Sequence, residues 1–476
     1  MATFVPAYIE VKEPRLRFHS TEEEYCSINP IEGLNAWGPY DASIPGCLRP
    51  NPLRVAILSP EKSFAPVVRF LEKLAKEGVP HTSRDEYVVD WPGFHHIFQT
   101  NLEFPTRLDE RLVEIVPEDA ADEAQKSSQP EIAFLEELKK HISVLLPIRH
   151  EFDVLLIHIP TRWAMFRERR DVGYHFDLHD ALKVFSAPNN LIIQLVEENS
   201  FSYQDQARVM WWLALALYVK GRGIPWKLAN PSPGTAFVGL SYGISNAVAS
   251  QRIILGCSQV FDQNGEGLKF LLYPVESPIF RGKNPFMSRE DARRLFGKVR
   301  DIYQDVNGAR PQRVVVHKTT HFTRDEMDGI GTALSGIEEI ELLQIQQDTS
   351  WRAIAYDGSR NLVSSFPVKR GTALPLDRYT SLLWTQGDIA GISAKRRHYY
   401  QEKRGIPAPL VIRRFRGSSP LEQVASEILR LTKMNWNNHQ LYNRLPVAIT
   451  SSNELAEIAK QVQQVWRVAY DFRHFM

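Results

Sequence analysis

Short apolar runs alternate with amphipathic stretches between residues 51 and 230. The apolar runs have the length of buried strands, and the stretches between them place apolar residues at helical spacing. This pattern predicts strands at residues 53–58, 153–159 and 191–196, and helices at residues 65–76, 178–185 and 204–220. Alternating strands and helices indicate a parallel, Rossmann-like sheet. Gly221 follows the last helix, where a left-handed cap is common.

The pattern changes after the Pro- and Gly-rich segment at residues 230–234. Beyond it the chain predicts three strands with short connections, a helix and a further strand, at residues 236–240, 252–261, 268–274, 288–303 and 313–317. This order is typical of a ribonuclease H-like core. Residues 1–50 are rich in turn formers and predict an irregular lead-in. We therefore expect an α/β protein with an irregular segment at 1–50, a first domain at 51–230 and a second at 231–476.

Several polar clusters have local explanations. Residues 117–129 form an acidic, polar stretch that predicts a surface loop before a helix near Ile132. Four pairs of a hydroxyl residue and an acid three positions later have the spacing of helix caps: Ser288 with Asp291, Thr323 with Glu326, Ser419 with Glu422, and Ser451 with Glu454. The acids at 325, 326 and 328 are thus interpreted as residues of a helix start.

Composition indicates an ordinary folded protein with 476 residues and 43% hydrophobic content. No apolar run has the roughly 18 residues that span a bilayer, and residues 1–13 lack a signal-peptide pattern, so we expect a cytoplasmic protein without membrane contact. Cys26, Cys47 and Cys257 lie far apart, which predicts reduced thiols and no zinc site.

The net charge of +1 does not indicate what the protein binds, but the charged residues are unevenly distributed along the chain. A basic stretch covers residues 395–416, where Glu402 is the one acid. Either it is a solvated loop and strand edge, or it contacts nucleic-acid phosphates. The basic residues of this stretch are Lys395, Arg396, Arg397, Lys403, Arg404, Arg413, Arg414 and Arg416.

Four polar side chains of the first domain form a candidate anion site. His179 and Lys183 are four apart on a predicted helix and so share one face. Gln194 lies on the next strand, and Lys220 ends the long helix. Each alone has a simple explanation, such as a surface histidine, an edge amide or a charge that suits the helix dipole. Two ammonium groups and neutral donors together could neutralise a terminal phosphate.

Those four residues resemble the guide 5′-phosphate pocket of Argonaute MID domains, with Lys220 preceding the turn GRGIPW at 221–226. A ring at His179 could stack on the first guide base. Residues 431–438 (LTKMNWNN) and 441–447 (LYNRLPV) closely resemble the C-terminal signature of PIWI domains, and 314–318 and 371–375 resemble further PIWI segments. The resemblance covers about residues 50–476, without the PAZ and N-terminal domains of long Argonautes. It implies a short prokaryotic Argonaute with a Rossmann-like MID domain and a ribonuclease H-like PIWI domain.

The sequence departs from that family at its catalytic positions. Ser241 and Thr319 stand where the resemblance implies carboxylates, and hydroxyls cannot collect two Mg²⁺ ions. We therefore expect no cleavage. Some relatives also hold a metal ion at the guide end. Here Ala216 replaces a ligand one turn before Lys220, which leaves the terminal carboxylate of Met476 as a candidate for Mg²⁺.

An Argonaute that cannot cut must act by binding. The resemblance implies a 5′-phosphorylated guide RNA that recognises single-stranded DNA of an invader. It also implies an obligate partner, an APAZ-containing effector with a sirtuin-like or TIR NADase or a nuclease, which target binding activates in abortive-infection defence. Lys395, Arg396, Arg397, Arg413 and Arg414 would contact the guide and target backbones. Two alternatives stay open: a metal-dependent nuclease that uses Asp262, Glu266 or Asp325, and a structural subunit that never loads a guide.

Overall fold

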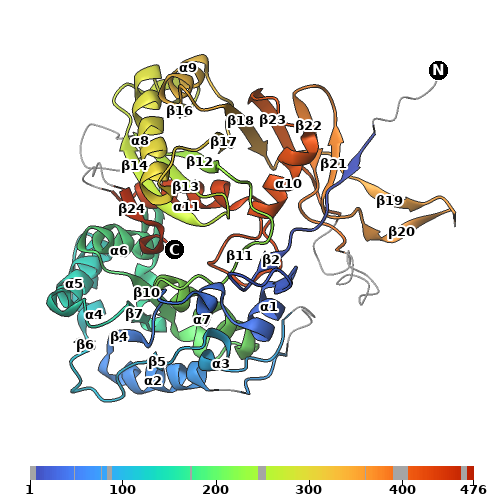
Figure 1. Cartoon of the computed structure of the whole chain (residues 1–476). Helices are drawn as coiled ribbons and strands as arrows, with labels where there is room; N and C mark the ends of the chain where they lie inside the picture. Colours follow the sequence, from blue (N-terminus) through green and yellow to red (C-terminus); the bar gives the residue numbers. More distant parts are fainter. Residues whose placement is uncertain are drawn as a thin grey trace.

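The computed structural model contains two large β-sheets that lie side by side, each with helices packed on it (Figure 1). It describes residues 7–476 apart from 48, 77, 83–87, 172–173, 245–253, 360, 390–405 and 463–468. None of the helices in these described ranges has the length and apolarity needed to cross a membrane.

The first sheet is parallel and buried, as the alternating pattern predicted. Its strand order is β10-β7-β4-β5, with β6 also paired to β4. The strands are β4 (Leu53–Pro60), β5 (Leu102–Glu103), β6 (Val113–Val116), β7 (Val154–Ile159) and β10 (Ile193–Glu197). The helices around it are α2 (Glu61–Ala75), α5 (Pro130–Leu145), α6 (Leu178–Ser186) and α7 (Gln206–Lys220). Every residue of β7 is buried, which is why its sequence reads as a continuous apolar run.

The end of α7 corrects one prediction. Gly221 has φ −74°, so it is not the left-handed residue; Arg222, with φ 77°, is. A Cβ atom on Gly221 would lie 2.5 Å from the side chain of Leu53 and 3.3 Å from that of Pro50. Glycine is thus needed here because the helix end packs closely against the start of β4, not because of its backbone conformation.

The second sheet is mixed and has ten strands, in the order β1-β21-β22-β23-β18-β17-β12-β13-β14-β24. β12 and β17 are parallel, as are β17 and β18, whereas β12, β13 and β14 are antiparallel neighbours. This confirms the ribonuclease H-like order. The strands are β1 (Ile9–Glu10), β12 (Thr235–Ile244), β13 (Ile254–Phe261), β14 (Gly267–Pro274), β17 (Arg313–Lys318), β18 (Glu339–Gln346), β21 (Thr372–Pro375), β22 (Thr380–Leu383), β23 (Leu410–Arg416) and β24 (Ala469–Asp471).

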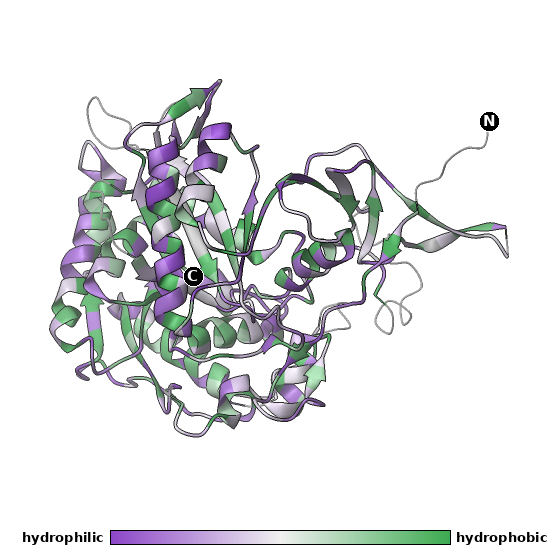
Figure 2. Ribbon diagram, turned by 45° about the horizontal axis from the view of Figure 1, so that its top comes forward, coloured by the Kyte–Doolittle hydropathy of each residue, from purple (hydrophilic) through white to green (hydrophobic). Residues whose placement is uncertain are grey.

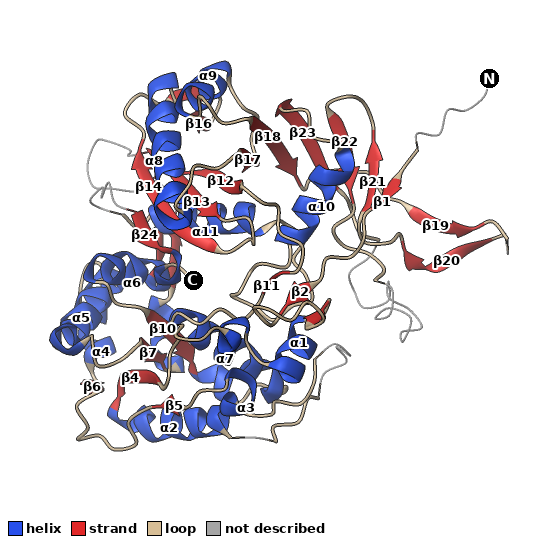
Figure 3. Cartoon of the chain, viewed as in Figure 1, coloured by secondary structure: helices blue, strands red, loops and turns tan. Residues whose placement is uncertain are grey.

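Helices cover both faces of the second sheet (Figure 3). Ala236, Val238 and Leu240 of β12 belong to the core that includes α8 (Arg289–Asn307) and α9 (Arg324–Ala333). Phe237, the alternate residue, belongs to the other core, with α10 (Leu421–Leu431) and α11 (Val447–Ala459). This alternation follows from the two-residue period of a strand. Figure 2 shows hydrophobic central strands and hydrophilic colour on much of the outer helices.

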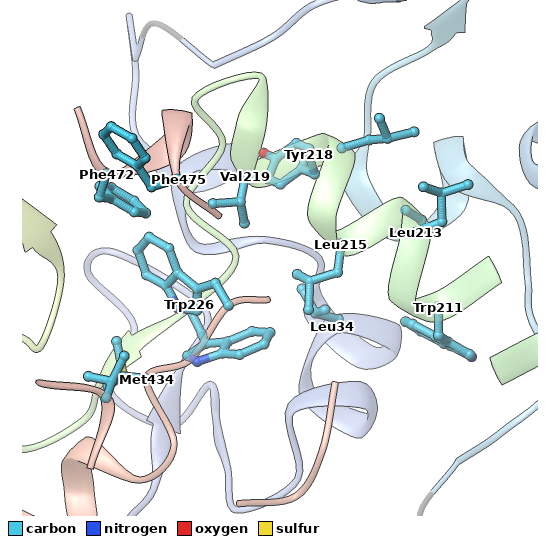
Figure 4. Packing of buried hydrophobic residues seen from close by; sticks show 14 of the residues in the cluster. Leu34, Trp211, Leu213, Leu215, Tyr218, Val219, Trp226, Met434, Phe472 and Phe475 are labelled. Atoms are coloured by element: carbon cyan, nitrogen blue, oxygen red, sulfur yellow. The ribbon is translucent and has the colours of Figure 1, made fainter. Parts of the chain in front are cut away.

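One hydrophobic core joins the two sheets (Figure 4). Tyr218 and Val219 of α7 belong to the same buried cluster as Phe472 and Phe475 from the end of the chain. Trp226, which lies between the sheets in sequence, also belongs to it, and its indole Nε1 donates to the carbonyl of Lys433 at 3.2 Å. The two halves therefore fold against each other rather than as separate bodies.

The first fifty residues are more regular than expected. They contain β1, β2 (Leu16–Arg17), β3 (Cys26–Ser27) and α1 (Pro30–Trp37). Asn29 caps α1, since its side chain accepts from the amide of Ile31, and proline follows at the first helical position. The turn formers thus mark a helix start instead of an irregular segment.

The acidic stretch at 117–129 is also more regular than predicted. It contains the short helix α4 (Ala120–Gln125), because Ala120, Ala121 and Ala124 pack into the core of the first sheet. Two of the four expected caps are confirmed, at Ser288 and Thr323. Two are wrong. Pro420 precedes α10, while the Ser419 hydroxyl donates to Glu339 at 2.6 Å, and Ser451 lies inside α11, which begins four residues earlier.

Candidate nucleic-acid site

A cavity of about 330 Å³ lies where α6, β10 and α7 of the first sheet meet α11 and the end of the chain, close to the point marked C in Figure 1. It brings together the four residues predicted to form an anion site, and Met476 with them. The lining residues are His179, Asp180, Lys183, Gln194, Trp212, Ala216, Lys220, Asn437, Glu454, Glu457, Ile458, Phe475 and Met476.

Helix α6 presents its polar face to this cavity because its other face is apolar. Asp177 caps the helix by accepting from the amide of Asp180 at 2.9 Å. Leu178 and Leu182 pack into the core of the first sheet. His179 and Lys183, four residues apart, consequently lie on the face that lines the cavity.

The two lysines are buried, and their hydrogen bonds among the described residues go to neutral acceptors. Lys183 is 7% exposed, and its Nζ donates to the carbonyl of Phe475 at 3.2 Å. Lys220 is 2% exposed, and its Nζ donates to the carbonyl of Ile193 and to Oε1 of Gln194, both at 2.8 Å. Each ammonium group has three N–H donors, so the site retains donor capacity for an anion.

The electrostatics of the cavity favour a negatively charged ligand. Burial lowers the pKa of Lys183, and burial together with the nearby Lys183 lowers the pKa of Lys220 well below its ordinary value. Burial and the same two lysines lower the pKa of His179, whose Nε2 is buried without a hydrogen-bond partner among the described residues. A ligand with two negative charges would oppose these shifts, because it favours the protonated forms of the lysines and the histidine.

Sequence reasoning missed three carboxylates of this cavity, those of Asp180, Glu454 and Glu457. Burial raises the pKa of Asp180 to about 6, and burial raises that of Glu454, while Lys183 opposes both shifts. Asp180 follows His179 directly, so its helical position could have suggested it. Glu454 was interpreted as part of a cap, and only the packing of α11 onto α6 reveals its place. Trp212 of α7 was also missed and adds a ring to the cavity wall.

A metal ion does not fit the groups present. The residue one turn before Lys220 is Ala216, which offers no ligand atom, although it lines the cavity. Over the part of the chain that the structure describes, no three His, Cys, Asp or Glu side chains converge as ligands. Met476 reaches the cavity, but its carboxylate has no such ligand set to join.

A second region corresponds to the expected catalytic end of the ribonuclease H-like sheet. Ser241 lies on β12, and Thr319 follows β17, the parallel neighbour of β12. Lys318 is 1% exposed and its Nζ lies 2.5 Å from Oε1 of Glu326, which is 0% exposed. The hydroxyl of Tyr242 donates to the same oxygen. A buried ion pair between Lys318 and Glu326 therefore lies next to Ser241 and Thr319.

Both carboxylate oxygens of Glu326 accept hydrogen bonds in this network. Its other oxygen accepts from the amide of Thr323 at 2.8 Å, which completes a capping box at the start of α9. The rings of Tyr242, Phe286 and Phe322 surround the Lys318 ammonium within 5.3 Å of their centroids. Aromatic faces stabilise such a cation where water is excluded.

The acids of the alternative nuclease do not converge on Ser241. Asp262 and Glu266 lie between β13 and β14, where Asp262 accepts from the amide of Glu266 at 2.9 Å. Because Phe261 pairs with Phe237, this turn is four residues along β12 from Ser241, roughly 13 Å at the rise of a strand. Asp325 is exposed in the first turn of α9.

The basic stretch is described only in part. Lys395, Arg396, Arg397, Lys403 and Arg404 lie outside the described residues. Arg413 is exposed on β23. Arg414 is held by the protein itself, since its Nε lies 3.1 Å from a carboxylate oxygen of the buried Glu341.

The fold is that of the MID and PIWI region of Argonautes. A structure of Clostridium butyricum Argonaute bound to a guide DNA and a 19-mer target DNA matches with a TM-score of 0.63 and 15% identity, over 96% of this chain and 53% of that one. Aquifex aeolicus Argonaute with externally bound siRNA matches with a TM-score of 0.61 and 15% identity, over 100% of this chain and 56% of the other. The chain thus spans about half the length of the Argonautes it matches. No protein-family model and no curated protein matches it.

Proposed function

We propose that this chain binds the 5′-phosphate end of a small guide nucleic acid in the cavity between α6, β10, α7 and α11. The observation that carries the proposal is the convergence of Lys183 and Lys220, both buried and both bonded to neutral acceptors, on one cavity with His179 and Gln194. A terminal phosphate would supply two negative charges to lysines whose hydrogen bonds otherwise go to neutral acceptors. It carries no sequence information, so guide sequence would be read by base pairing with a target.

The fold supports nucleic acid as the ligand class. The C. butyricum structure holds a guide DNA and a target DNA, and the A. aeolicus structure an externally bound siRNA. For this chain we propose a guide RNA and a complementary single-stranded DNA target, as in the short Argonautes that its sequence resembles.

We further propose that the chain does not cut its target. Ser241 and Thr319 cannot hold paired divalent ions, and the neighbouring Glu326 is committed to Lys318, Tyr242 and Thr323. Purified protein loaded with a guide should leave a labelled complementary strand intact in Mg²⁺ or Mn²⁺. Guide-dependent cleavage at a fixed position would establish the nuclease alternative instead.

A protein that binds without cutting needs a partner to produce a response. From the resemblance to short Argonautes we propose an APAZ-containing effector, a sirtuin-like or TIR NADase or a nuclease, which guide and target binding activate in antiviral defence. Co-expression with the neighbouring reading frame, followed by purification and sequencing of bound nucleic acid, tests this. A stable complex that contains no small nucleic acid would favour a purely structural subunit.

The phosphate site itself is tested by the double variant Lys183→Ala/Lys220→Ala. Guides of one sequence are compared with a 5′ phosphate and with a 5′ hydroxyl. Charge-assisted hydrogen bonds contribute about 1.5–3 kcal/mol each, so losing both lysines should weaken binding of the phosphorylated guide about 100-fold or more. Binding of the hydroxyl guide should change little.

The matched control is Lys126→Ala/Lys140→Ala, which removes the same charge from two lysines that are 68% and 72% exposed on the surface. It should keep the preference for the phosphorylated guide. Thermal unfolding of each variant verifies that it is folded. An unchanged preference in the Lys183→Ala/Lys220→Ala protein would refute the site.

A further inference from the structure

A second, larger cavity of about 860 Å³ lies at the opposite end of the first sheet from the strand ends where ligands of parallel sheets commonly bind. It is formed where β4, β7 and β10 begin and where α7 ends. Its lining residues are Arg49, Pro50, Asn51, Pro52, Arg54, Pro147, Arg149, His150, Phe152, Asp153, Asn190, Leu191, Ile192, Lys220, Gly221 and Arg222.

The lining is strongly basic. Four arginines and Lys220 contribute positive charge, and His150 adds a titratable ring, whereas Asp153 is the one acid among the lining residues. Asp153 is already engaged, because its Oδ2 accepts from the amide of Arg54 at 2.8 Å, and burial raises its pKa. The cavity therefore concentrates positive potential that its own residues do not neutralise.

Two of the arginines are available to a ligand. Arg149 and Arg222 are exposed, and neither forms a salt bridge with a carboxylate in the described part of the chain. Arg149 makes a local hydrogen bond from Nη1 to the carbonyl of Leu146 at 2.9 Å, which leaves its other donors free. Arg54 is paired with Glu103, but at 3.5 Å and with both side chains about half exposed, where such pairs contribute little.

The backbone at Arg222 points to a functional position. Its φ of 77° lies in the left-handed region, which is unfavourable for a non-glycine residue. The conformation is held by hydrogen bonds from the amides of Arg222 to Val219 and of Gly223 to Tyr218, at 3.0 and 2.8 Å. Glycine or asparagine would fit this turn with less strain. The arginine instead places a guanidinium at the mouth of the cavity.

Part of the remaining wall is apolar, and Asn51 and Asn190 also line it. Phe152, Leu191, Ile192 and three prolines supply surface for a base or a sugar beside the arginines. Arginine is suited to phosphate because its planar fork makes paired hydrogen bonds. We propose that this cavity is a second nucleotide site, which binds the phosphate and base of one nucleotide unit, either a free nucleotide or a nucleotide within a single strand. The inference does not depend on the guide-end assignment.

The test measures binding of two probes by fluorescence anisotropy and calorimetry. One probe is ATP, and the other is a seven-nucleotide DNA with a 5′ hydroxyl, which lacks the terminal phosphate that the guide-end cavity would hold. The test variant is Arg149→Ala/Arg222→Asn, in which asparagine tolerates the left-handed backbone. The control is Arg107→Ala/Arg293→Ala, which removes two arginines that are 74% and 49% exposed on other surfaces.

We expect at least one probe to bind, and its affinity to fall at least tenfold in the Arg149→Ala/Arg222→Asn protein but not in the control. Loss of ATP binding identifies a free nucleotide as the ligand, and loss of oligonucleotide binding identifies a strand. Lys183→Ala must leave the binding unchanged, which separates this cavity from the guide-end site. The inference is overturned if neither probe binds, if the arginine variant binds as the control does, or if Lys183→Ala abolishes the binding.

Discussion

Two regions of this molecule bury lysine in opposite ways. At the end of β17, Lys318 forms a 2.5 Å ion pair with Glu326 and is enclosed by three aromatic rings. In the cavity beside α7, Lys183 and Lys220 are equally buried, but they donate to carbonyl and amide oxygens. In the first region the ammonium group forms a direct ion pair, whereas in the second no carboxylate of the described residues forms one with either lysine, although Asp180 and Glu454 line the same cavity.

On the proposed function, Lys318 carries a structural charge, whereas Lys183 and Lys220 carry charges used for binding. A buried ammonium group without a counterion costs stability, and a fold retains it where a ligand supplies the opposite charge. The Lys318 region, by contrast, offers nothing to a ligand, although it occupies the end of the sheet where the resemblance places catalysis. The following predictions test this contrast, from the largest expected effect to the smallest.

Glu326→Ala should lower the free energy of unfolding by about 3–5 kcal/mol, because it leaves Lys318 charged and unpaired in the core. Urea unfolding followed by circular dichroism measures this. The double variant Lys318→Met/Glu326→Leu removes both charges and should recover most of the loss. If the single variant were as stable as the unaltered protein, the pair would not be the closed structural unit described above.

Lys220→Met should have the opposite effect and raise the free energy of unfolding at pH 7. Burial and Lys183 lower the Lys220 pKa in the folded protein, so the folded state resists the protonated form that is present at this pH. The gain should shrink as pH approaches about 10, where the unfolded lysine also loses its proton. The same variant should bind a phosphorylated guide more weakly. Destabilisation at pH 7 would contradict the idea of an uncompensated charge.

Asp180→Asn should change how stability depends on pH. Burial raises the Asp180 pKa from 3.8 to about 6, so the folded state favours the neutral carboxyl. The stability that the neutral Asp180 carboxyl gives the folded state is fully present below about pH 4 and is lost as the pH rises through about 6. Since the side chain is partly exposed, we expect a loss of roughly 1 kcal/mol. Unfolding free energies from pH 4 to 7 should show this loss in the unaltered protein and in Asp109→Asn, but not in Asp180→Asn.

The fold was largely predictable because its two sheets follow simple periodicities. Buried parallel strands such as β7 are continuous apolar runs, and β12 alternates between two cores. The errors arose where tertiary packing outweighed local signals. Gly221 was interpreted as a left-handed cap, yet its close approach to Leu53 explains it. Ser419 has the spacing of a cap, but its hydroxyl is used by Glu339 and Arg313.

The candidate site was predictable only in part. Helical spacing placed His179 and Lys183 on one face, and the structure brings Gln194 and Lys220 to the same cavity. Glu454 could not be placed, because its electrostatic interaction with Lys183 depends on how α11 packs onto α6. The ion pair between Lys318 and Glu326 could not be predicted either, because the sequence shows only a capping box there.

The N-terminal segment determines whether the half of the chain that holds the second sheet can be expressed alone. Glu13 lies 2.9 Å from Arg370 and 2.6 Å from Lys433, whose side chains are both 0% exposed. The same segment pairs with β21 of the second sheet through β1 and with β11 (Lys227–Leu228), the link between the sheets, through β2. A fragment cut at residue 231 would thus lose the counterion of two buried cations, so the second half is not a module that can be excised and expressed alone.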